Sequence, residues 1–419
     1  MTKYAWLILG TVLLQFNGMA AITVPGADSS DGTLHVTSST AIDLSQADSG
    51  SWDDDNTANA GLGIYDSNKW AVVYKYSSVT IDSLATLTFS NHISRAPVVW
   101  LVDGDVTING TVSLNGEGYL TSTTPTLAAP GPGGFRGGMG KYSTGVGASA
   151  GFGPGGGHTT VSTIGYGASH AETAVNSPAV YGNPSLVPLL GGSGGGGSGL
   201  DYGGGAGGGA ILIACSGTIT VNGIIMANGG AGYDRSYSNY DCGGGSGGGI
   251  RLIADAFVGS GTVEAQAGSG NYPGSLGRVR LERVTNNNTW TTIAPEPSVI
   301  GLTAGDSALL WPTATSPTVK ILSIGGEAVS GDPLASFGTV GADVSLAQTN
   351  TIQVLIETEN VEQASAVTVR LTPRANASYT EVLASVDLVT STDPLVVQWT
   401  ADVPVGDGYS AIQVHVVRP

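Results

Sequence analysis

The sequence predicts an all-β protein in two parts: a parallel β-helix (solenoid) with glycine-rich loops, followed by a C-terminal β-sandwich. Three observations carry this prediction. A strand-like pattern recurs at residues 97–118, 210–232 and 250–270, and glycine, 66 of the 419 residues, clusters between these copies. After residue 297 glycine becomes ordinary, and alternating apolar runs follow one another closely. Strands that recur in repeats stack into solenoids, whereas closely spaced alternating strands are typical of sandwiches.

Residues 1–20 have the features of a signal peptide. Lys3 supplies a positive charge, the stretch "YAWLILGTVLLQF" is mainly apolar, and small residues precede a cut after Ala20. No later segment reaches about 18 uninterrupted apolar residues, so no membrane span is expected after cleavage. We therefore expect a protein that is secreted, or held at a cell surface by partners.

The three copies predict the rungs of a β-helix over residues 21–285. The first two align without a gap at a spacing of 113 residues, so that Asn109 falls on Asn222. Each copy has an apolar run, a glycine corner, an alternating β-branched run such as residues 106–108, and an Asn-Gly corner. Stacked rungs would bury Val, Ile and Leu and turn Thr and Ser outward. The same pattern also allows a β-sandwich built from hairpins.

Residues 119–202 are predicted to be a long glycine-rich insertion. Such a composition is usual for linkers, but interspersed aromatic residues, among them Phe135, Phe152 and Tyr181, favour loops that lie on the flank of the β-helix. Polyproline II strands packed side by side would also use glycine in this way. The run "GGGAGGG" at 203–209 precedes a strand and has no lysine nearby, so it does not fit a nucleotide-binding loop. We expect it to be a corner of the repeat.

Residues 286–297 are predicted to be a linker, and residues 298–419 a sandwich of immunoglobulin or fibronectin III type. Seven or eight strand-like runs follow at intervals of about 8 to 15 residues. Alternation is clean where Ile352, Val354 and Ile356 share one face. The runs "ALLW" (308–311) and "DVSL" (343–346) are counted among these strands.

Composition and charge restrict the function. Hydrophobic residues make up 41% of the chain and charged residues only 11%, which is not the composition of a disordered protein. The net charge of −17 would repel nucleic acid and anionic lipid, so neither is an expected partner.

Two groups of residues are candidates for a disulfide and for a metal site. Cys215 and Cys242 are the only cysteines, and both a disulfide and two separate thiols remain open. The sequence requires no cofactor, and the run Asp53, Asp54 and Asp55 is the first candidate if Ca²⁺ binds, although its spacing matches no calcium loop.

Catalytic residues for a polysaccharide lyase or hydrolase would be grouped carboxylates, or carboxylates with basic residues, on one face of the β-helix. The candidates are Asp255, Glu264, Arg251 and Arg280. The two arginines hold equivalent repeat positions and could stack as an outward pair, and simply solvated arginines are the alternative. Because several converging carboxylates are not found, no catalytic residue is assigned and a non-enzymatic protein is expected.

A loop rich in tyrosine, "GYDRSYSNYDCGGG", lies between the second and third copies. Tyr233, Asp234, Arg235, Tyr237 and Tyr240 could bind a sugar or a protein, because a ring stacks on a sugar face while polar neighbours fix it. A loop packed on the wall of the β-helix is the alternative.

The segments "DVTINGTVSLNGEG", "PGPGGFRGG", "GFGPGGG" and "GGGSGGGIRLIA" resemble glycine-rich exported bacterial surface proteins with pectate-lyase-like right-handed parallel β-helix repeats. The resemblance covers about residues 70–285 and includes no catalytic motif. It implies a non-catalytic structural or adhesive protein with polysaccharide or other cell-surface components as partners. The alternatives are a polysaccharide-acting lyase or hydrolase, and a carbohydrate- or calcium-binding module.

Overall fold

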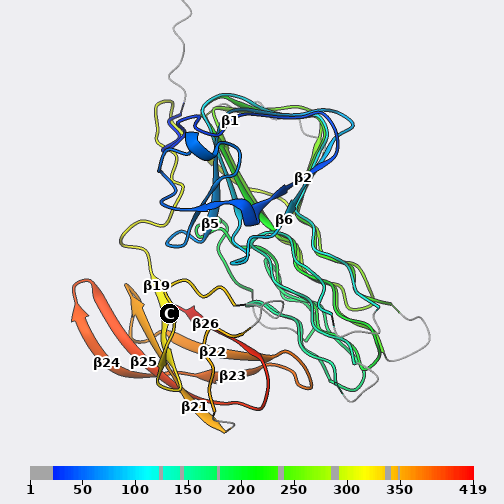
Figure 1. Cartoon of the computed structure of the whole chain (residues 1–419), viewed down its shortest axis with the longest axis vertical. Coiled ribbons are helices and arrows are strands. Elements are labelled where there is room, and N and C mark those ends of the chain that lie inside the picture. The colour runs from blue at the N-terminus through cyan, green and yellow to red at the C-terminus, as the bar shows by residue number, and fades with distance from the viewer. Residues whose placement is uncertain are drawn as a thin grey trace, which may run out of the picture.

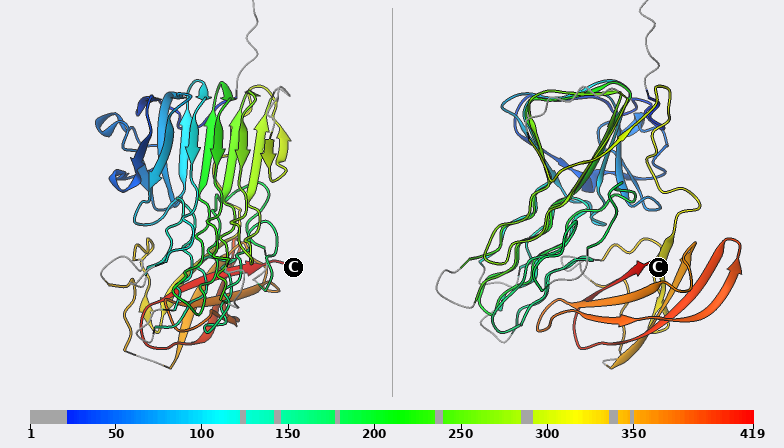
Figure 2. Two further views of the ribbon diagram at one scale, coloured as in Figure 1. Left: turned by 90° about the vertical axis from the view of Figure 1, so that its right-hand side faces the viewer. Right: turned by 180° about the vertical axis from the view of Figure 1, so that it is seen from behind.

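The computed structural model describes residues 22–121, 126–141, 146–176, 180–234, 240–284, 292–335, 341–347 and 350–419. The predicted signal peptide lies outside these residues. Within them the protein is all-β, with two short 3₁₀ helices, η1 (Leu44–Gln46) and η2 (Thr57–Asn59). Figures 1 and 2 show curled parallel sheets at one end, thin extended segments beneath them, and antiparallel strands beside those segments.

The parallel strands form three rows. The long strand β5 (Ala71–Ile81) belongs to the first row through its beginning and to the second through its end. The first row continues with β7 (Val98–Val102), β10 (Ala210–Cys215), β13 (Gly249–Ala254), β16 (Arg278–Arg283) and β18 (Ser298–Gly301). The second contains β1 (Gly32–Val36), β8 (Val106–Ile108), β11 (Thr218–Val221) and β14 (Ala256–Val258). The third contains β2 (Thr40–Asp43), β6 (Thr86–Ser90), β9 (Thr111–Ser113), β12 (Ile224–Met226), β15 (Thr262–Glu264) and β17 (Thr292–Ala294). Two short strands, β3 (Asp48–Ser49) and β4 (Ile64–Asp66), lie at the β5 side.

The repeats stack in parallel, in the register that the sequence alignment predicts. Ile211 pairs with Val98 in the first row, and Ile219 pairs with Val106 in the second. The Asn-Gly corner at 109–110 separates β8 from β9, so it turns the chain from one row into the next. The hairpin alternative would need antiparallel pairs between neighbouring strands of a copy, and these rows are parallel instead.

Side chains of the second row alternate between the interior and the outside. Val79, Val106, Ile219 and Phe257 are in register and all buried in one core. Thr107, between two buried positions of β8, is partly exposed. The predicted inward ladder of apolar residues is therefore confirmed for this row.

Strands β7 and β10 are buried on both faces, which explains why their sequences do not alternate. Their outer side chains, such as Val99 and Leu212, pack against Ile22 and Leu310. Residues 308–311, predicted to be a strand of the C-terminal part, have no strand structure and cover the outside of the first row instead. Strand β18, inside the range predicted as sandwich, likewise pairs with β16. The apolar side chains of residues 308–311 thus pack against the outer side chains of β7 and β10.

Extended glycine-rich segments connect the third row back to the first, and we call them together the glycine bundle (Figure 2). The bundle comprises residues 114–120, 127–141, 147–158, 164–171, 190–209, 227–233, 242–248 and 265–277. They are hydrogen-bonded to one another and largely buried, and they extend away from the parallel strands instead of lying on their flank (Figure 2).

The hydrogen bonds of the bundle repeat every three residues. Successive N–H groups from Gly203 to Ala210 donate in rotation to three neighbouring segments at 2.6 to 3.1 Å. The first segment accepts at Leu120, Glu117 and Leu114, the second at Gly138, Phe135 and Pro132, and the third at Gly243 and Ser246. Three residues per turn without internal hydrogen bonds is the geometry of a polyproline II helix. The run at 203–209 is therefore an extended bundle segment, and the predicted corner is wrong.

The bundle contains so many glycines because its segments pack backbone against backbone. A Cβ atom at Gly207 would overlap the carbonyl oxygen of Gly192, and one at Gly151 would overlap that of Gly194. Any side chain at such a position would push neighbouring segments apart and break their hydrogen bonds.

The C-terminal strands form two antiparallel sheets. One has the order β20 (Glu327–Ala328), β19 (Thr318–Ile324), β21 (Thr351–Glu359), β25 (Leu395–Pro404), β24 (Ser385–Thr392), and the other β23 (Thr380–Leu383), β22 (Ala366–Pro373), β26 (Ser410–Val417). A core draws on both sheets and includes Ile352, Val354 and Ile356, as their alternation predicts. Residues 343–346, predicted to be a strand, have no strand structure, and Asp343, Val344 and Leu346 among them line a cavity instead.

Candidate functional site

Three tyrosines meet at the end of the glycine bundle that lies away from the parallel strands. Tyr202 and Tyr233 stack face to face, with ring centroids 3.8 Å apart and planes inclined by 10°. Tyr119 packs edge-on, 5.0 Å from the Tyr233 centroid and 6.3 Å from that of Tyr202, and is 37% exposed. The Tyr119 N–H donates to the carbonyl of Ala231 at 2.8 Å, so the bundle also positions this ring. We call these three residues the tyrosine cluster.

The structure places part of the predicted tyrosine loop in this cluster. Tyr233 belongs to it, Asp234 is exposed beside it, and Tyr240 is half-buried. Arg235 and Tyr237 lie outside the described residues. Sequence reasoning missed Tyr119 and Tyr202, which are distant in the chain. Both tyrosines directly adjoin a glycine-rich segment in the sequence, and this feature could have identified them.

The carboxylates of Asp53, Asp54 and Asp55 are exposed and close their own loop. Ser51 donates through its hydroxyl to Asp53 and through its N–H to Asp54, and the Thr57 N–H donates to Asp55 at 2.7 Å. Hydrogen bonds from the Ser51 and Thr57 side chains hold the pKa values of Asp53 and Asp55 below the usual range. Among the described residues no group of three or more His, Cys, Asp and Glu could hold a metal ion. Calcium at this run stays a prediction.

Cys215 and Cys242 are both free and buried, so the structure has two separate thiols and no bridge. Cys215 faces the core of the parallel strands, whereas Cys242 begins a bundle segment, where its sulfur accepts the Tyr233 N–H at 2.9 Å. Burial raises the pKa of the Cys242 thiol to about 12 and that of Cys215 further still. Neither thiol is suited to nucleophilic chemistry.

The candidate residues of a polysaccharide-cleaving site serve as structural contacts. Arg251 and Arg280 are register partners on the outer face of the first row, as the repeat predicts, but other residues cover them, so the pair is not open to solvent. Arg251 is only 2% exposed because residues 309 and 310 cover it and accept its hydrogen bonds. Glu282 lies 2.8 Å from Arg251 and 3.2 Å from Arg280. The Glu264 carboxylate accepts the Asn228 amide at 2.7 Å, and Asp255 follows the end of β13.

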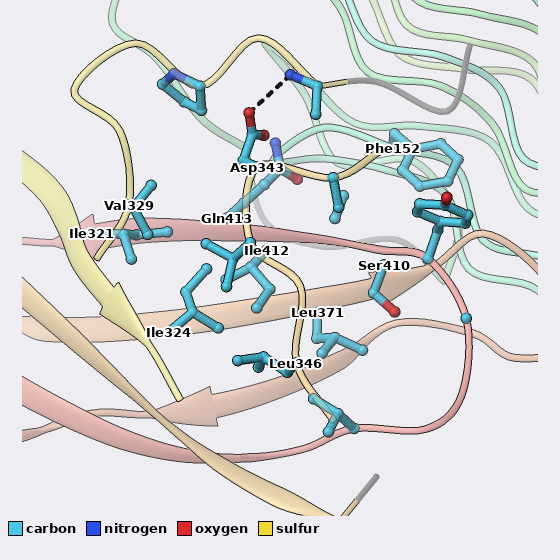
Figure 3. A pocket seen from close by; sticks show the side chains of 18 of the residues that line it. Phe152, Ile321, Ile324, Val329, Asp343, Leu346, Leu371, Ser410, Ile412 and Gln413 are labelled. Atoms are coloured by element: carbon cyan, nitrogen blue, oxygen red, sulfur yellow. Dashed lines mark hydrogen bonds between the residues drawn. The ribbon is translucent and has the colours of Figure 1, made fainter. Parts of the chain in front are cut away.

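A cavity of about 550 Å³ lies between the glycine bundle and the C-terminal strands. The bundle contributes Phe135, Arg136 and Phe152, and β19, β21, β22 and β26 contribute most of an apolar wall. Figure 3 shows Ile321, Ile324, Ile412, Leu371 and Leu346 along this wall, and Phe152 at one end. None of these residues was singled out as a site from the sequence.

Contacts between the bundle and the C-terminal strands fix the cavity walls. The buried Arg370 of β22 donates to the Gly153 carbonyl of the bundle at 3.2 Å and to the Glu381 carboxylate at 2.7 Å. Its guanidinium also lies 4.1 Å from the Tyr379 ring centroid, and that ring packs against His158 of the bundle. The cavity is therefore bounded by packed elements on both sides.

Two arginines give this cavity a positive end. Arg95 and Arg136 both line it, and neither has an ion-pair partner among the described residues. Burial, with the nearby Arg136 charge, lowers the pKa of Arg95 to about 9. Burial also lowers the pKa of Arg136, although Glu117 opposes this shift. The buried Nε of Arg136 has no hydrogen-bond partner.

No family model, curated protein or solved structure matches the chain. Among the described residues, none of the helices has the length and apolar content needed to cross a membrane.

Proposed function

We propose that the protein is an exported, non-catalytic structural and adhesive protein of the bacterial cell surface or its surroundings. In this proposal a parallel β-helix and an immunoglobulin- or fibronectin III-like sandwich hold the glycine bundle between them. The bundle acts as a stiff arm, and the tyrosine cluster at its end contacts cell-surface polysaccharide. Stacked parallel rows in register and two antiparallel sheets around one core support these two architectures.

The rotation of hydrogen bonds along Gly203–Ala210 is the observation that carries the proposal. Each of these N–H groups has a backbone acceptor in another segment, so the glycine-rich sequence is cross-linked in three directions. A linker or a mobile loop needs no such network. A rigid arm that displays aromatic rings at its end suits adhesion, because the rings bind without a further ordering cost.

The tyrosine cluster supports a saccharide as the contacted ligand. Tyr119 is 37% exposed, and its ring packs edge-on against the ring of Tyr233. The neighbouring Asp234 is exposed and offers a hydrogen-bond acceptor for sugar hydroxyls. An exposed ring beside a polar group is a usual arrangement for stacking on a sugar face.

A glycan array with the mature protein tests this function. We expect binding to a subset of polysaccharides, and Tyr119→Ala should weaken it about ten-fold through the lost ring stacking. Tyr409→Ala is the matched control, because Tyr409 is also exposed, at 48%, but lies at the cavity and not in the cluster. An equal loss in both variants, or no binding to any glycan, would contradict the proposal.

A second assay addresses the enzymatic alternative. Incubation with acidic and neutral polysaccharides should release no new reducing ends and no unsaturated products. The burial of Arg251 and its ion pair with Glu282 support this expectation, since both groups are occupied within the fold. Reproducible product formation would replace the adhesive function with a lyase or hydrolase.

A further inference from the structure

We propose that the cavity between the glycine bundle and the C-terminal strands binds a small amphiphilic carboxylate. Its carboxylate would lie at Arg95 and Arg136, and its hydrocarbon body against the apolar wall. This inference goes beyond the adhesive function, since it uses a different part of the molecule from the tyrosine cluster. A volume of about 550 Å³ is within the range of small-molecule sites.

The two arginines are the first argument for an anionic group. The chain has a net charge of −17 and only 15 lysines and arginines, yet two of these arginines lie together at the cavity without a salt bridge among the described residues. Arg95 and Arg136 nevertheless repel each other at one cavity wall, where burial makes both charges costly. A guanidinium that is partly desolvated and unpaired is stabilised by a carboxylate, which it binds through two parallel hydrogen bonds.

Two acidic residues line the cavity, Asp343 and Asp407, and neither forms an ion pair with Arg95 or Arg136. Asp343 lines the cavity, but its carboxylate accepts the Ala335 N–H at 2.9 Å. Figure 3 shows Asp343 beside Gln413, away from Phe152. Arg136 belongs to the Phe152 end, since its carbonyl accepts the Phe152 N–H at 3.0 Å. Asp343 and Arg136 therefore belong to different ends of the cavity, and Asp407 is an exposed residue of the loop that precedes β26.

The rest of the wall argues for a hydrocarbon body. Ile321, Ile324, Leu371 and Ile412 come from three strands and face the same space, as Figure 3 shows. Phe135 and Phe152 of the bundle complete this lining. Inorganic anions would leave this surface in water, whereas an alkyl chain of a few carbons would cover it. Each buried methylene strengthens binding roughly four-fold.

Calorimetric titration of the full chain with octanoate and with 1-octanol tests the inference. Octanoate should bind at least ten-fold more tightly than octanol, and hexanoate should bind more weakly than octanoate by roughly four-fold per methylene. Arg95→Gln and Arg136→Gln should each remove most of the preference for octanoate and leave octanol binding unchanged. Arg418→Gln is the matched control, because Arg418 forms an exposed ion pair with Glu362 outside the cavity.

Measurements on the unmodified protein keep the test independent of variant folding. Octanoate should displace octanol, and sulfate at the same concentration should not. Equal affinities for octanoate and octanol would overturn the role of the arginines. Sulfate binding as tightly as octanoate would overturn the role of the apolar wall. Absence of binding by octanoate at millimolar concentration would overturn the proposal as a whole.

Discussion

Replacement of Gly207 by alanine should destabilise the glycine bundle far more than a surface Gly→Ala change. The added Cβ would overlap the Gly192 carbonyl, so the two segments must separate. Separation weakens the bonds from the Gly207 N–H to Phe135, 2.9 Å, and from the Gly192 N–H to Gly208, 2.8 Å. Overpacking costs about 1 to 3 kcal/mol, and two hydrogen bonds add about 1 kcal/mol each. We expect a loss of about 3 to 5 kcal/mol.

The free energy of unfolding, measured by urea titration with circular dichroism, checks this value. Gly301→Ala is the matched control, because a Cβ at Gly301 in β18 meets no atom within 4 Å. Its effect should remain within about 0.5 kcal/mol, as for most surface changes. Equal effects of the two substitutions would refute the reasoning that the bundle is closely packed.

Three further predictions concern buried polar groups. Burial lowers the pKa of His170 from 6.5 to about 4. The neutral imidazole therefore stabilises the fold fully above pH 6.5. Acidification towards pH 4 should lower the free energy of unfolding by up to about 3 kcal/mol. Urea titrations across this range should show that slope, and His170→Phe should flatten it; an unchanged slope would contradict the assignment. Glu282→Gln leaves Arg251 buried without its carboxylate and should cost about 3 to 5 kcal/mol in the same assay, whereas a loss below about 1 kcal/mol would contradict a buried pair. Cys215 and Cys242 should resist a thiol reagent in the folded protein and react only in denaturant; fast labelling without denaturant would show that they are accessible.

The sequence was informative wherever side chains alternate or repeat. Val106 and Ile108 are buried as their period of two predicts, and the spacing of 113 residues gave the pairing of Asn109 with Asn222, whose side chains hydrogen-bond at 2.9 Å. Alternation also identified the buried face of β21. These features depend on local pattern, and physical rules for strands translate local pattern directly into structure.

The glycine bundle and the cavity were harder to predict for a physical reason. A run such as Gly203–Gly209 has almost no side chains, so it has no hydrophobic period from which to infer its neighbours. Polyproline II packing could be raised as a hypothesis, but the identity of the acceptor segments could not. The meeting of Arg95 with Arg136 depends on how the bundle packs on the first row and on the C-terminal strands. The local feature of the sequence that pointed to the cavity was Arg136, an arginine within the glycine-rich stretch "PGGFRGG".

Hydrogen exchange of the amides from Gly203 to Gly209 tests the central claim most directly. Each of these N–H groups donates to a backbone carbonyl of another segment, so we expect protection comparable with that of β10, which follows in the chain. Peptides covering 203–209 and 210–215 can be followed by mass spectrometry in one experiment. Slow exchange in both peptides is the predicted result. Complete exchange of 203–209 within seconds, with 210–215 still protected, would show a mobile loop and contradict the account.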